Sequence, residues 1–464
     1  MKKVLSIIMT LMLVLSMCAC AASGQGDANA TGLQVGYAKV SISPDLATMG
    51  AVGLGGYSDA ETRKATGYLD YVYATCIAVT EGDETVLLYT MDMTAVNMDV
   101  ANKCRSKISD VTGIPEDHIF FGATHTHSAP SSSVTAFLNF VVETTATAAQ
   151  KALEDRAPAA ILSNAVTVEG MNFDRNYKRS DGTYTGSNYG FTSQAPITEH
   201  STKSDTELQL VKFDRADDKG DILLTNWQAH PCYASTISYT DISSDYIGVL
   251  RDKVEKETGM KVAHFQGASG NQNTDSRIDS ELHGMSMKEY GEKLAQAVVD
   301  GVANLKPVEG SGIKTSRVQF DCEYDHTYDN QVPKAREAYD LWKKSDLSTG
   351  NILAKEYGFS SVYQCRAIIS RASLPASGKL DLCAVKVGGM AFVTVPYEMF
   401  SDAGLAIKDG SPFDTTLICT GNNGYIASAA AFDFHSYEAD TGLYVKGTAE
   451  KLANQLISML KGLE

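Results

Sequence analysis

The chain has 464 residues, of which 44% are hydrophobic and 21% are charged, and its formal net charge is −16 at pH 7. This composition excludes a disordered chain and a bundle of membrane spans, and it allows one large domain or two closely packed ones. The acidic balance, without a cluster of Lys and Arg, argues against nucleic acid as a partner.

The first twenty residues have the features of an export signal. Two lysines near the start precede an apolar run, residues 4–17, which is too short to remain as a membrane span. Ala19 then precedes Cys20, an arrangement that resembles the lipobox of bacterial lipoproteins. We therefore expect residues 1–20 to be a lipoprotein signal peptide, with lipidated Cys20 as a tether on the outer face of a bacterial cytoplasmic membrane. Plain secretion is the alternative.

Residues 21–32 are rich in Gly, Ala, Ser and Asp and lack periodicity, which predicts a flexible tether. A catalytic domain is then expected over residues 33–464. The seven cysteines of this region are scattered and lack the short spacing of a metal knuckle. They indicate buried apolar side chains rather than a disulfide framework.

From residue 33 onward, apolar runs of strand character alternate with segments of helical period. One helix is expected to bury a face formed by Val100, Cys104, Ile108 and Val111. The predicted strands are 86–89, 119–123, 222–227, 262–265, 391–395 and 417–419, and the other predicted helices are 134–153, 246–258, 287–305 and 449–460. This alternation predicts an α/β fold in which mixed sheets are flanked by helices.

Two further segments stand apart from this alternation. Residues 333–373 are rich in helical pattern and are expected to pack over one edge of the main body. Residues 173–200 are rich in Gly, Ser, Thr, Tyr and Asn, with little periodicity. This composition favours a long surface loop, a candidate lid.

Polar side chains follow the predicted strands, where α/β sheets bind their ligands. His125 and His127 come after strand 119–123, and their spacing places both on one side of an extended segment. His230 follows strand 222–227, and Glu398 follows strand 391–395.

Neutral imidazoles together with one carboxylate are the ligand class of catalytic zinc. The convergence of His125, His230 and Glu398 at matching strand ends therefore predicts a metal site. Four other histidines are interpreted as structural or surface residues: His118, His200, His264 and His435.

A serine hydrolase is the competing chemistry, with Ser269 as the nucleophile. The nucleophile elbow requires the pattern Gly-x-Ser-x-Gly, and Asn271 stands in place of its last glycine. The glycines of this segment are better explained by a close approach of backbone to ligand.

Several sequence blocks together resemble the neutral, non-lysosomal ceramidase family, from about residue 33 to the closing helix. They are residues 40–44 (VSISP), 124–130 (THTHSAP), 205–213 (DTELQLVKF), 226–231 (NWQAHP), 396–398 (PYE), 423–426 (NGYI), 437–438 (YE) and 443–444 (LY).

The resemblance implies a Zn²⁺ ion held by His125, His230, Glu398 and Tyr425. A metal-activated water would then attack an amide carbonyl.

The same resemblance gives roles to three further residues. His127 would handle a proton or stabilise the oxyanion beside the metal. Arg175 and Tyr437 would contact the polar head of the substrate.

Three departures from the family concern its nucleophile, its extent and its substrate. The family segment whose serine has been proposed as a nucleophile has Asn273 at that position, and Asn273 cannot attack as an alkoxide. We expect no counterpart of the C-terminal immunoglobulin-like domain of the family. Residues 321–380 bear little likeness to the family, and an acyl-chain pocket could differ there.

We therefore expect a zinc amidohydrolase that acts on a ceramide-like lipid or another small N-acyl amide. A zinc esterase, deacetylase or peptidase with a smaller substrate is one alternative. A lipoprotein that binds a ligand without chemistry is another, and its metal content would distinguish it from the two enzymes.

Overall fold

The computed structural model describes residues 32–57, 62–186, 195–216, 218–278, 284–344, 347–395, 397–421 and 424–464. Residues 1–31, which include Cys20 and most of the expected tether, lie outside this part. The first described strand, β1, begins at Leu33.

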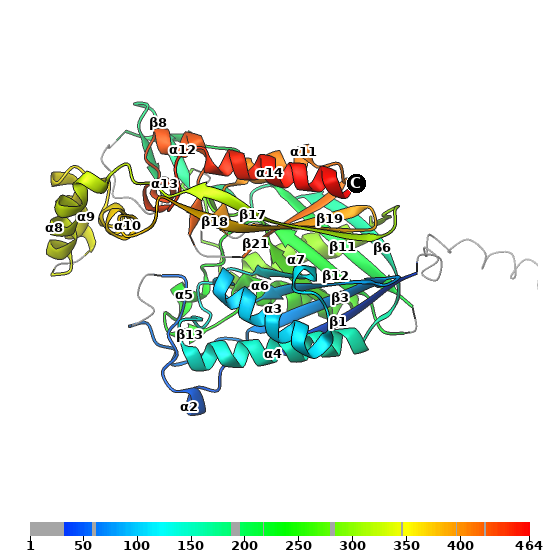
Figure 1. The fold of residues 1–464 in the computed structure, drawn as a ribbon. Coiled ribbons are helices and arrows are strands. Elements are labelled where there is room, and N and C mark those ends of the chain that lie inside the picture. Colours follow the sequence, from blue (N-terminus) through cyan, green and yellow to red (C-terminus); the bar gives the residue numbers. More distant parts are fainter. Residues whose placement is uncertain are drawn as a thin grey trace, which may run out of the picture.

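Two β-sheets lie face to face and are covered by helices on both outer sides (Figure 1). The larger sheet has the strand order β14-β12-β11-β6-β1-β3-β4-β5, with β16 beside β6. Its strands are β1 (Leu33–Ser41), β3 (Tyr73–Glu81), β4 (Glu84–Met91), β5 (Ile119–Ala123), β6 (Ala157–Thr167), β11 (Glu207–Arg215), β12 (Ile222–Trp227), β14 (Lys261–Gln266) and β16 (Lys306–Pro307). The smaller sheet has the order β17 (Ile313–Glu323), β18 (Ser377–Val387), β19 (Met390–Val395) and β21 (Thr415–Thr420).

The strands are apolar on both faces because both faces are covered. In β3, Cys76 and Ala78 pack against helices, whereas Ile77 and Val79 pack in the core between the sheets. Cys419 of β21 also belongs to the core between the sheets. Burial on both faces explains why these strands appear in the sequence as continuous apolar runs.

Helices cover the outer faces of both sheets, and their ends are marked by capping residues. The larger sheet is covered by α3 (Met98–Thr112), α4 (Thr135–Glu154), α6 (Tyr246–Thr258) and α7 (Met287–Val302), and the smaller one by α11 (Ser401–Gly410) and α14 (Thr448–Leu463). Asn97 caps α3, which ends at the left-handed Gly113, and Ser286 and Glu289 form a capping box at α7.

The predicted α/β class, with mixed sheets and flanking helices, is confirmed. The prediction that Val111 belongs to the buried face of its helix is wrong. Val111 lies in the last turn of α3 and is 39% exposed, so the buried face ends at Ile108.

The prediction of a long loop over residues 173–200 is wrong for the residues that are described. This segment contains the strands β7 (Phe173–Asp174), β8 (Asn176–Arg179), β9 (Tyr184–Gly186) and β10 (Ile197–His200). The last three form a small sheet, and β7 pairs with β15 (Gln272–Asn273). These strands are two to four residues long, too short to leave a periodic pattern in the sequence.

The helical insert comprises α8 (Val332–Trp342), α9 (Leu347–Glu356) and α10 (Val362–Arg371), with a small core of its own. It projects from one end of the sheets (Figure 1). The expected packing over a sheet edge is wrong, because the insert meets the body mainly where α10 contacts α13 (Tyr437–Thr441).

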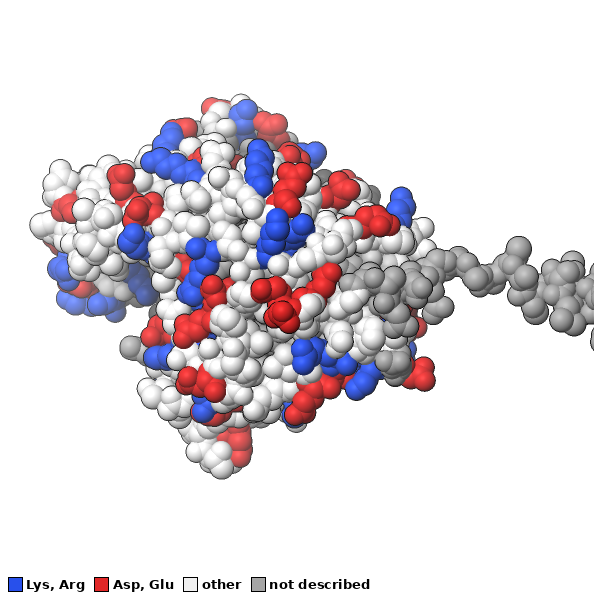
Figure 2. Space-filling view, turned by 45° about the vertical axis from the view of Figure 1, so that its right-hand side comes forward, with Lys and Arg blue, Asp and Glu red and all other residues white. Residues whose placement is uncertain are grey.

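On the face drawn in Figure 2, acidic and basic side chains are interspersed. None of the described helices is long and apolar enough to cross a membrane. The seven cysteines among the described residues are all free, and six of them are buried.

Candidate metal centre

The candidate site lies beyond the ends of three parallel-paired strands. His125 and His127 follow β5, His230 follows β12, and Glu398 begins the short strand β20 (Glu398–Met399) after β19. β20 pairs in parallel with β22 (Tyr425–Ile426), which places Glu398 opposite Tyr425. The larger sheet curls so that its outermost strands β5 and β14 are in contact, and this brings distant loops together.

Three imidazoles and a carboxylate converge at this point. One ring nitrogen from each of His125, His127 and His230 lies within 4.8 Å of the others. The Oε2 atom of Glu398 is 3.0 Å from Nε2 of His230 and 3.4 Å from Nε2 of His125. All four side chains are buried. The structure therefore brings together three predicted metal ligands, with His127 beside them.

Backbone carbonyls orient two of these rings. Nδ1 of His125 lies 2.8 Å from the carbonyl oxygen of Thr94, and Nδ1 of His230 lies 3.1 Å from that of Gln272. A carbonyl can only accept, so we assign the proton of each neutral ring to Nδ1. The lone pairs on Nε2 then face the centre of the cluster, as in metal-binding histidines.

The protonation states suit a cation at this centre. Burial lowers the pKa of His127 well below its ordinary value, and the neighbouring His125 and His230 add to the effect. Burial likewise lowers the pKa of His230.

With a proton on Nδ1, the Nε2 atoms of these rings carry lone pairs, and like the Glu398 carboxylate they are hydrogen-bond acceptors that face one another. Nε2 of His127 is 3.3 Å from Nε2 of His125, and the carboxylate lies against the same group. A cation in their midst would satisfy all of them, and this donor set suits zinc. The residues present therefore fit the metal that the sequence predicts.

The loop that contains Gly56 and Tyr57 holds His127 in place, and sequence reasoning missed it. Gly56 has a φ of 96°, and a Cβ atom there would lie 2.6 Å from Cγ of His127. The ring of Tyr57 meets the imidazole edge to face, with centroids 5.0 Å apart. Nδ1 of His127 is buried and has no hydrogen-bond partner in the described part of the chain.

A buried ion pair forms the opposite wall. Nε of Arg175 donates to Oε1 of Glu438 at 2.6 Å, and its guanidinium lies 5.2 Å from the centre of the Tyr425 ring. Burial opposes the charge of Arg175, but Tyr425 and Glu438 hold its pKa well above the ordinary value. Sequence reasoning gave Glu438 no role, although it holds the predicted cation in place.

The two tyrosines of the site are in contact and protonated. The ring of Tyr437 meets that of Tyr425, with centroids 5.7 Å apart. Burial raises the pKa of Tyr437 to about 12 and that of Tyr425 well above its ordinary value. Both hydroxyls are therefore available as donors at neutral pH. The assignment of Tyr425 as a metal ligand stays a prediction.

The competing serine does not have the partners of a nucleophile. Ser269 is buried, and none of the described histidines forms a hydrogen bond with its hydroxyl. The adjacent glycine has a packing role instead: a Cβ atom on Gly270 would lie 2.5 Å from the carbonyl oxygen of Glu398. Asn273 belongs to β15 and pairs with Phe173.

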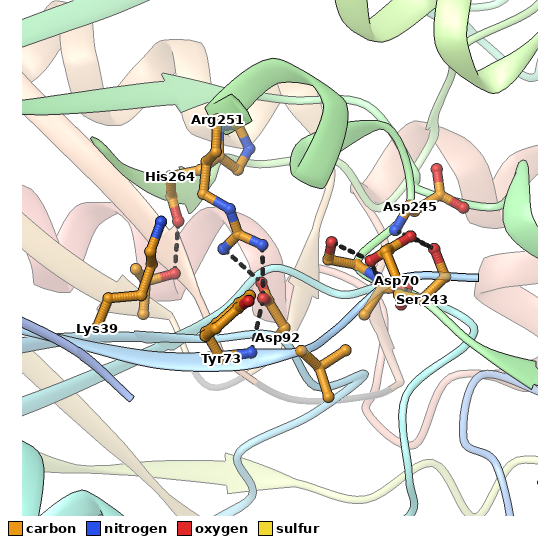
Figure 3. A network of polar contacts seen from close by, with 12 residues as sticks. Lys39, Asp70, Tyr73, Asp92, Ser243, Asp245, Arg251 and His264 are labelled. Atoms are coloured by element: carbon orange, nitrogen blue, oxygen red, sulfur yellow. Dashed lines mark hydrogen bonds and ion pairs between the residues drawn. The ribbon is translucent and has the colours of Figure 1, made fainter. Parts of the chain in front are cut away.

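A second polar network, drawn in Figure 3, is hydrogen-bonded to the loops that contain the site histidines. The hydroxyl of Thr126 donates to the carbonyl oxygen of Ser243, and Ser243 N–H donates to that of Ser128. Asp245 accepts from Ala234 N–H at 2.6 Å, just after the His230 turn. Both loops are thus fixed to one buried cluster.

Arg251 and His264 complete this network. Arg251 donates to both carboxylate oxygens of Asp92, at 2.6 and 2.9 Å. Nδ1 of His264 lies 2.9 Å from the hydroxyl of Thr225. His264 therefore has the structural role expected of it.

Solved structures of ceramidases resemble this chain over most of its length. Neutral ceramidase from Pseudomonas aeruginosa matches with a TM-score of 0.68 and 15% identity, covering 93% of this chain and 74% of that one. A ceramidase complexed with C2 matches with a TM-score of 0.68 and 13% identity, covering 93% of this chain and 75% of that one. This chain has the neutral ceramidase fold.

At sequence identities of 15% and 13%, the similarity to the ceramidases shows a shared fold and no more. No family model matches the sequence, and no curated protein sequence is similar to it.

Proposed function

We propose that this protein is a zinc-dependent hydrolase that cleaves an N-acyl amide bond, with a ceramide-like or other N-acyl lipid as substrate. The observation that carries the proposal is the convergence of three buried imidazoles and one carboxylate in a chain with the ceramidase fold. Such a donor set is typical of hydrolytic zinc.

His125, His230, Glu398 and Tyr425 would hold the metal. When bound, zinc lowers the pKa of a water molecule toward about 7 and polarises the carbonyl that is attacked. The carbonyl partners of His125 and His230 keep the rings oriented for this role.

The remaining residues of the site stabilise the negative charge of the transition state and transfer the proton. The positive charge of Arg175 and the hydroxyl of Tyr437 stabilise the negative charge that develops on the carbonyl oxygen. His127 is neutral, so it can take up a proton at Nε2, which faces the cluster, and pass it to the departing amine.

The lipobox-like segment supports a location outside the cytoplasmic membrane. Tethering through Cys20 would hold the domain close to lipid substrates. Residues 21–32 would then separate the anchor from β1.

The direct test is to incubate the purified, zinc-loaded protein with ceramide, other N-acyl lipids and N-acyl amino acids, and to measure free amine. Matched esters of the same acyl chains and metal-free protein serve as controls. We expect amine from at least one amide, and none without metal. Release of acid from esters alone would point to the esterase, and binding without turnover would point to the ligand-binding lipoprotein.

A further inference from the structure

A cavity of about 250 Å³ lies between the helical insert and the body. Lys355 and Phe359 line it from the insert, and Tyr184, Phe434 and His435 line it from the body. The insert meets the body here, through the contact of α10 with α13 (Figure 1).

The cavity shares a wall with the candidate active site. Asn176 lines the cavity, follows Arg175 in the chain and donates its side-chain amide to Oε2 of Glu438 at 3.2 Å. Ser436 also lines the cavity and caps α13, whose first residue is Tyr437. Two residues that line the cavity are therefore next in the chain to predicted catalytic residues: Asn176 follows Arg175, and Ser436 precedes Tyr437.

The charged side chains that line the cavity are of one sign. Among the described lining residues, Lys355 and His435 are the ionisable bases, and none is a carboxylic acid. The hydrogen bond from His435 to Asp440 raises the pKa of His435 and favours its charged form. The chain as a whole has a net charge of −16, but the basic side chains of this lining attract an anion locally.

His435 is held in an unusual conformation. Its φ is 54°, in the left-handed region, where a non-glycine residue is uncommon and often functional. Its Nδ1 lies 3.2 Å from Oδ1 of Asp440, and the other carboxylate oxygen of Asp440 accepts from Ser360 of the insert. In the described part of the chain, Nε2 of His435 has no hydrogen-bond partner, which leaves it for a ligand.

Three of the other eight lining residues are aromatic: Tyr184, Phe359 and Phe434. The rings of Tyr184 and Phe434 are stacked with centroids 4.3 Å apart, and Phe359 is buried. The volume lies below the range typical of pockets for drug-sized ligands, about 300–1,000 Å³. The cavity suits a compact group with an apolar body rather than a long acyl chain.

We propose that this cavity binds an anionic end of the substrate, so that the amides cleaved by this protein carry a carboxylate or phosphate. This inference rests on the proposed function. Lys355 and the charged His435 would bind the anion, and the position of Asn176 and Ser436 would place the amide at the metal centre.

The test compares amides that differ in charge alone at one end. N-dodecanoyl-glycine and N-dodecanoyl-phosphoethanolamine are the anionic substrates, and N-dodecanoyl-ethanolamine is the neutral one. N-dodecylsuccinamate and N-dodecylbutanamide form a second pair, with the anion on the acyl side. Turnover is measured with the zinc-loaded full chain, and binding is measured by calorimetry with the metal-free chain.

We expect kcat/KM to be higher for the anionic member of at least one pair. Lys355→Gln should lower that preference about tenfold, mainly through KM, because a charge-assisted hydrogen bond is lost. Lys355→Arg should retain the preference, and Lys344→Gln, which changes an exposed lysine of the same insert, should have no effect.

The outcomes separate this inference from the proposed function. If neutral and anionic amides are cleaved equally by both the wild type and Lys355→Gln, the cavity assignment is wrong and the hydrolase stands. If the anionic compounds bind in a Lys355-dependent way but no amide is cleaved, the cavity assignment stands and the hydrolase fails.

Discussion

At the scale of single residues, the candidate site is defined by hydrogen-bond acceptors, imidazole nitrogens and a carboxylate. They face one another without a positive charge between them. His125 and His230 present their lone pairs to the same carboxylate, that of Glu398. Burying several hydrogen-bond acceptors together lowers the stability of the folded protein unless a donor or a cation interacts with them. A cation would thus contribute to stability as well as to chemistry.

Replacing His125 or His230 with Ala should abolish zinc binding and amide hydrolysis together. Each change removes one of the few donors on which tight binding depends. Elemental analysis of the purified variants is the measurement. His326→Ala, at a half-buried histidine outside the site that contacts Asp329, is the matched control and should retain full zinc. Full occupancy in both site variants would refute the ligand assignment.

His127→Ala should lower turnover by roughly a hundredfold or more while zinc remains bound, because one transition-state partner is lost. Ser269→Ala should have a far smaller effect, since none of the described histidines is positioned to activate this hydroxyl. Single-turnover hydrolysis and zinc content are measured in parallel. Loss of zinc from His127→Ala would make this residue a ligand instead. A trapped acyl adduct on Ser269 would overturn the water mechanism.

At the scale of elements, close backbone contact positions the carboxylate of the site. Gly270 N–H donates to the carbonyl oxygen of Met399 at 2.8 Å, which ties the glycine-rich segment to β20. Arg175 donates to the carbonyl oxygen of Gly270 at 2.9 Å. One glycine therefore connects the segment with Glu398 to the buried cation.

Gly270→Ala should weaken zinc binding and lower the free energy of unfolding by about 1–3 kcal/mol, the usual cost of overpacking. The added Cβ would lie 2.5 Å from the backbone oxygen of Glu398, so β20 must shift. Gly462→Ala in α14 is the control, because nothing lies within 4 Å of a Cβ at that position. The control should be neutral or stabilising. Urea unfolding and zinc titration test both variants, and normal zinc affinity in Gly270→Ala would contradict the prediction.

His264, in β14, should make stability depend on pH. Burial, with a contribution from Arg251, lowers the pKa of His264 from 6.5 to about 3. Between these values the unfolded chain binds a proton that the folded chain does not, so the free energy of unfolding falls as pH falls below about 6.5.

In His264→Asn, that dependence should be shallower by up to ~1.4 kcal/mol per pH unit between pH 6 and pH 4. The Asn side chain can still reach Thr225, the partner of Nδ1. Urea unfolding at several pH values gives the slope for each protein. Equal slopes for the wild type and the variant would show that His264 does not contribute.

The regular elements could be predicted from the sequence because their patterns are local. The strand 222–227 and the helix 246–258 have the predicted bounds in β12 and α6. Within residues 173–200, β8, β9 and β10 could not be predicted because they are only three or four residues long. The strand β7 could not be predicted because its partner β15 lies far along the chain. The partner of Arg175 was missed for the same reason, since Glu438 lies 263 residues along the chain.

At the scale of the whole molecule, the lipid tether stays a prediction that cells can test. Cys20→Ala should abolish incorporation of a labelled fatty acid and release the protein from the membrane fraction. Cys18→Ala, two residues upstream, is the control and should leave labelling intact. Labelling and fractionation of cells that express each variant are the measurements. A mature N-terminus downstream of Cys20 would favour plain secretion.

The core between the two sheets draws on both ends of the chain. Val35 of β1 and Cys419 of β21 belong to the same cluster, although 384 residues separate them in the sequence (419 − 35). Contacts of such high sequence separation slow folding, because long loops must close before the contacts can form. During synthesis this core cannot close until the last strand has left the ribosome. If the first twenty residues direct export as predicted, the open core leaves the nascent chain able to pass through a secretion channel before this part of the fold closes.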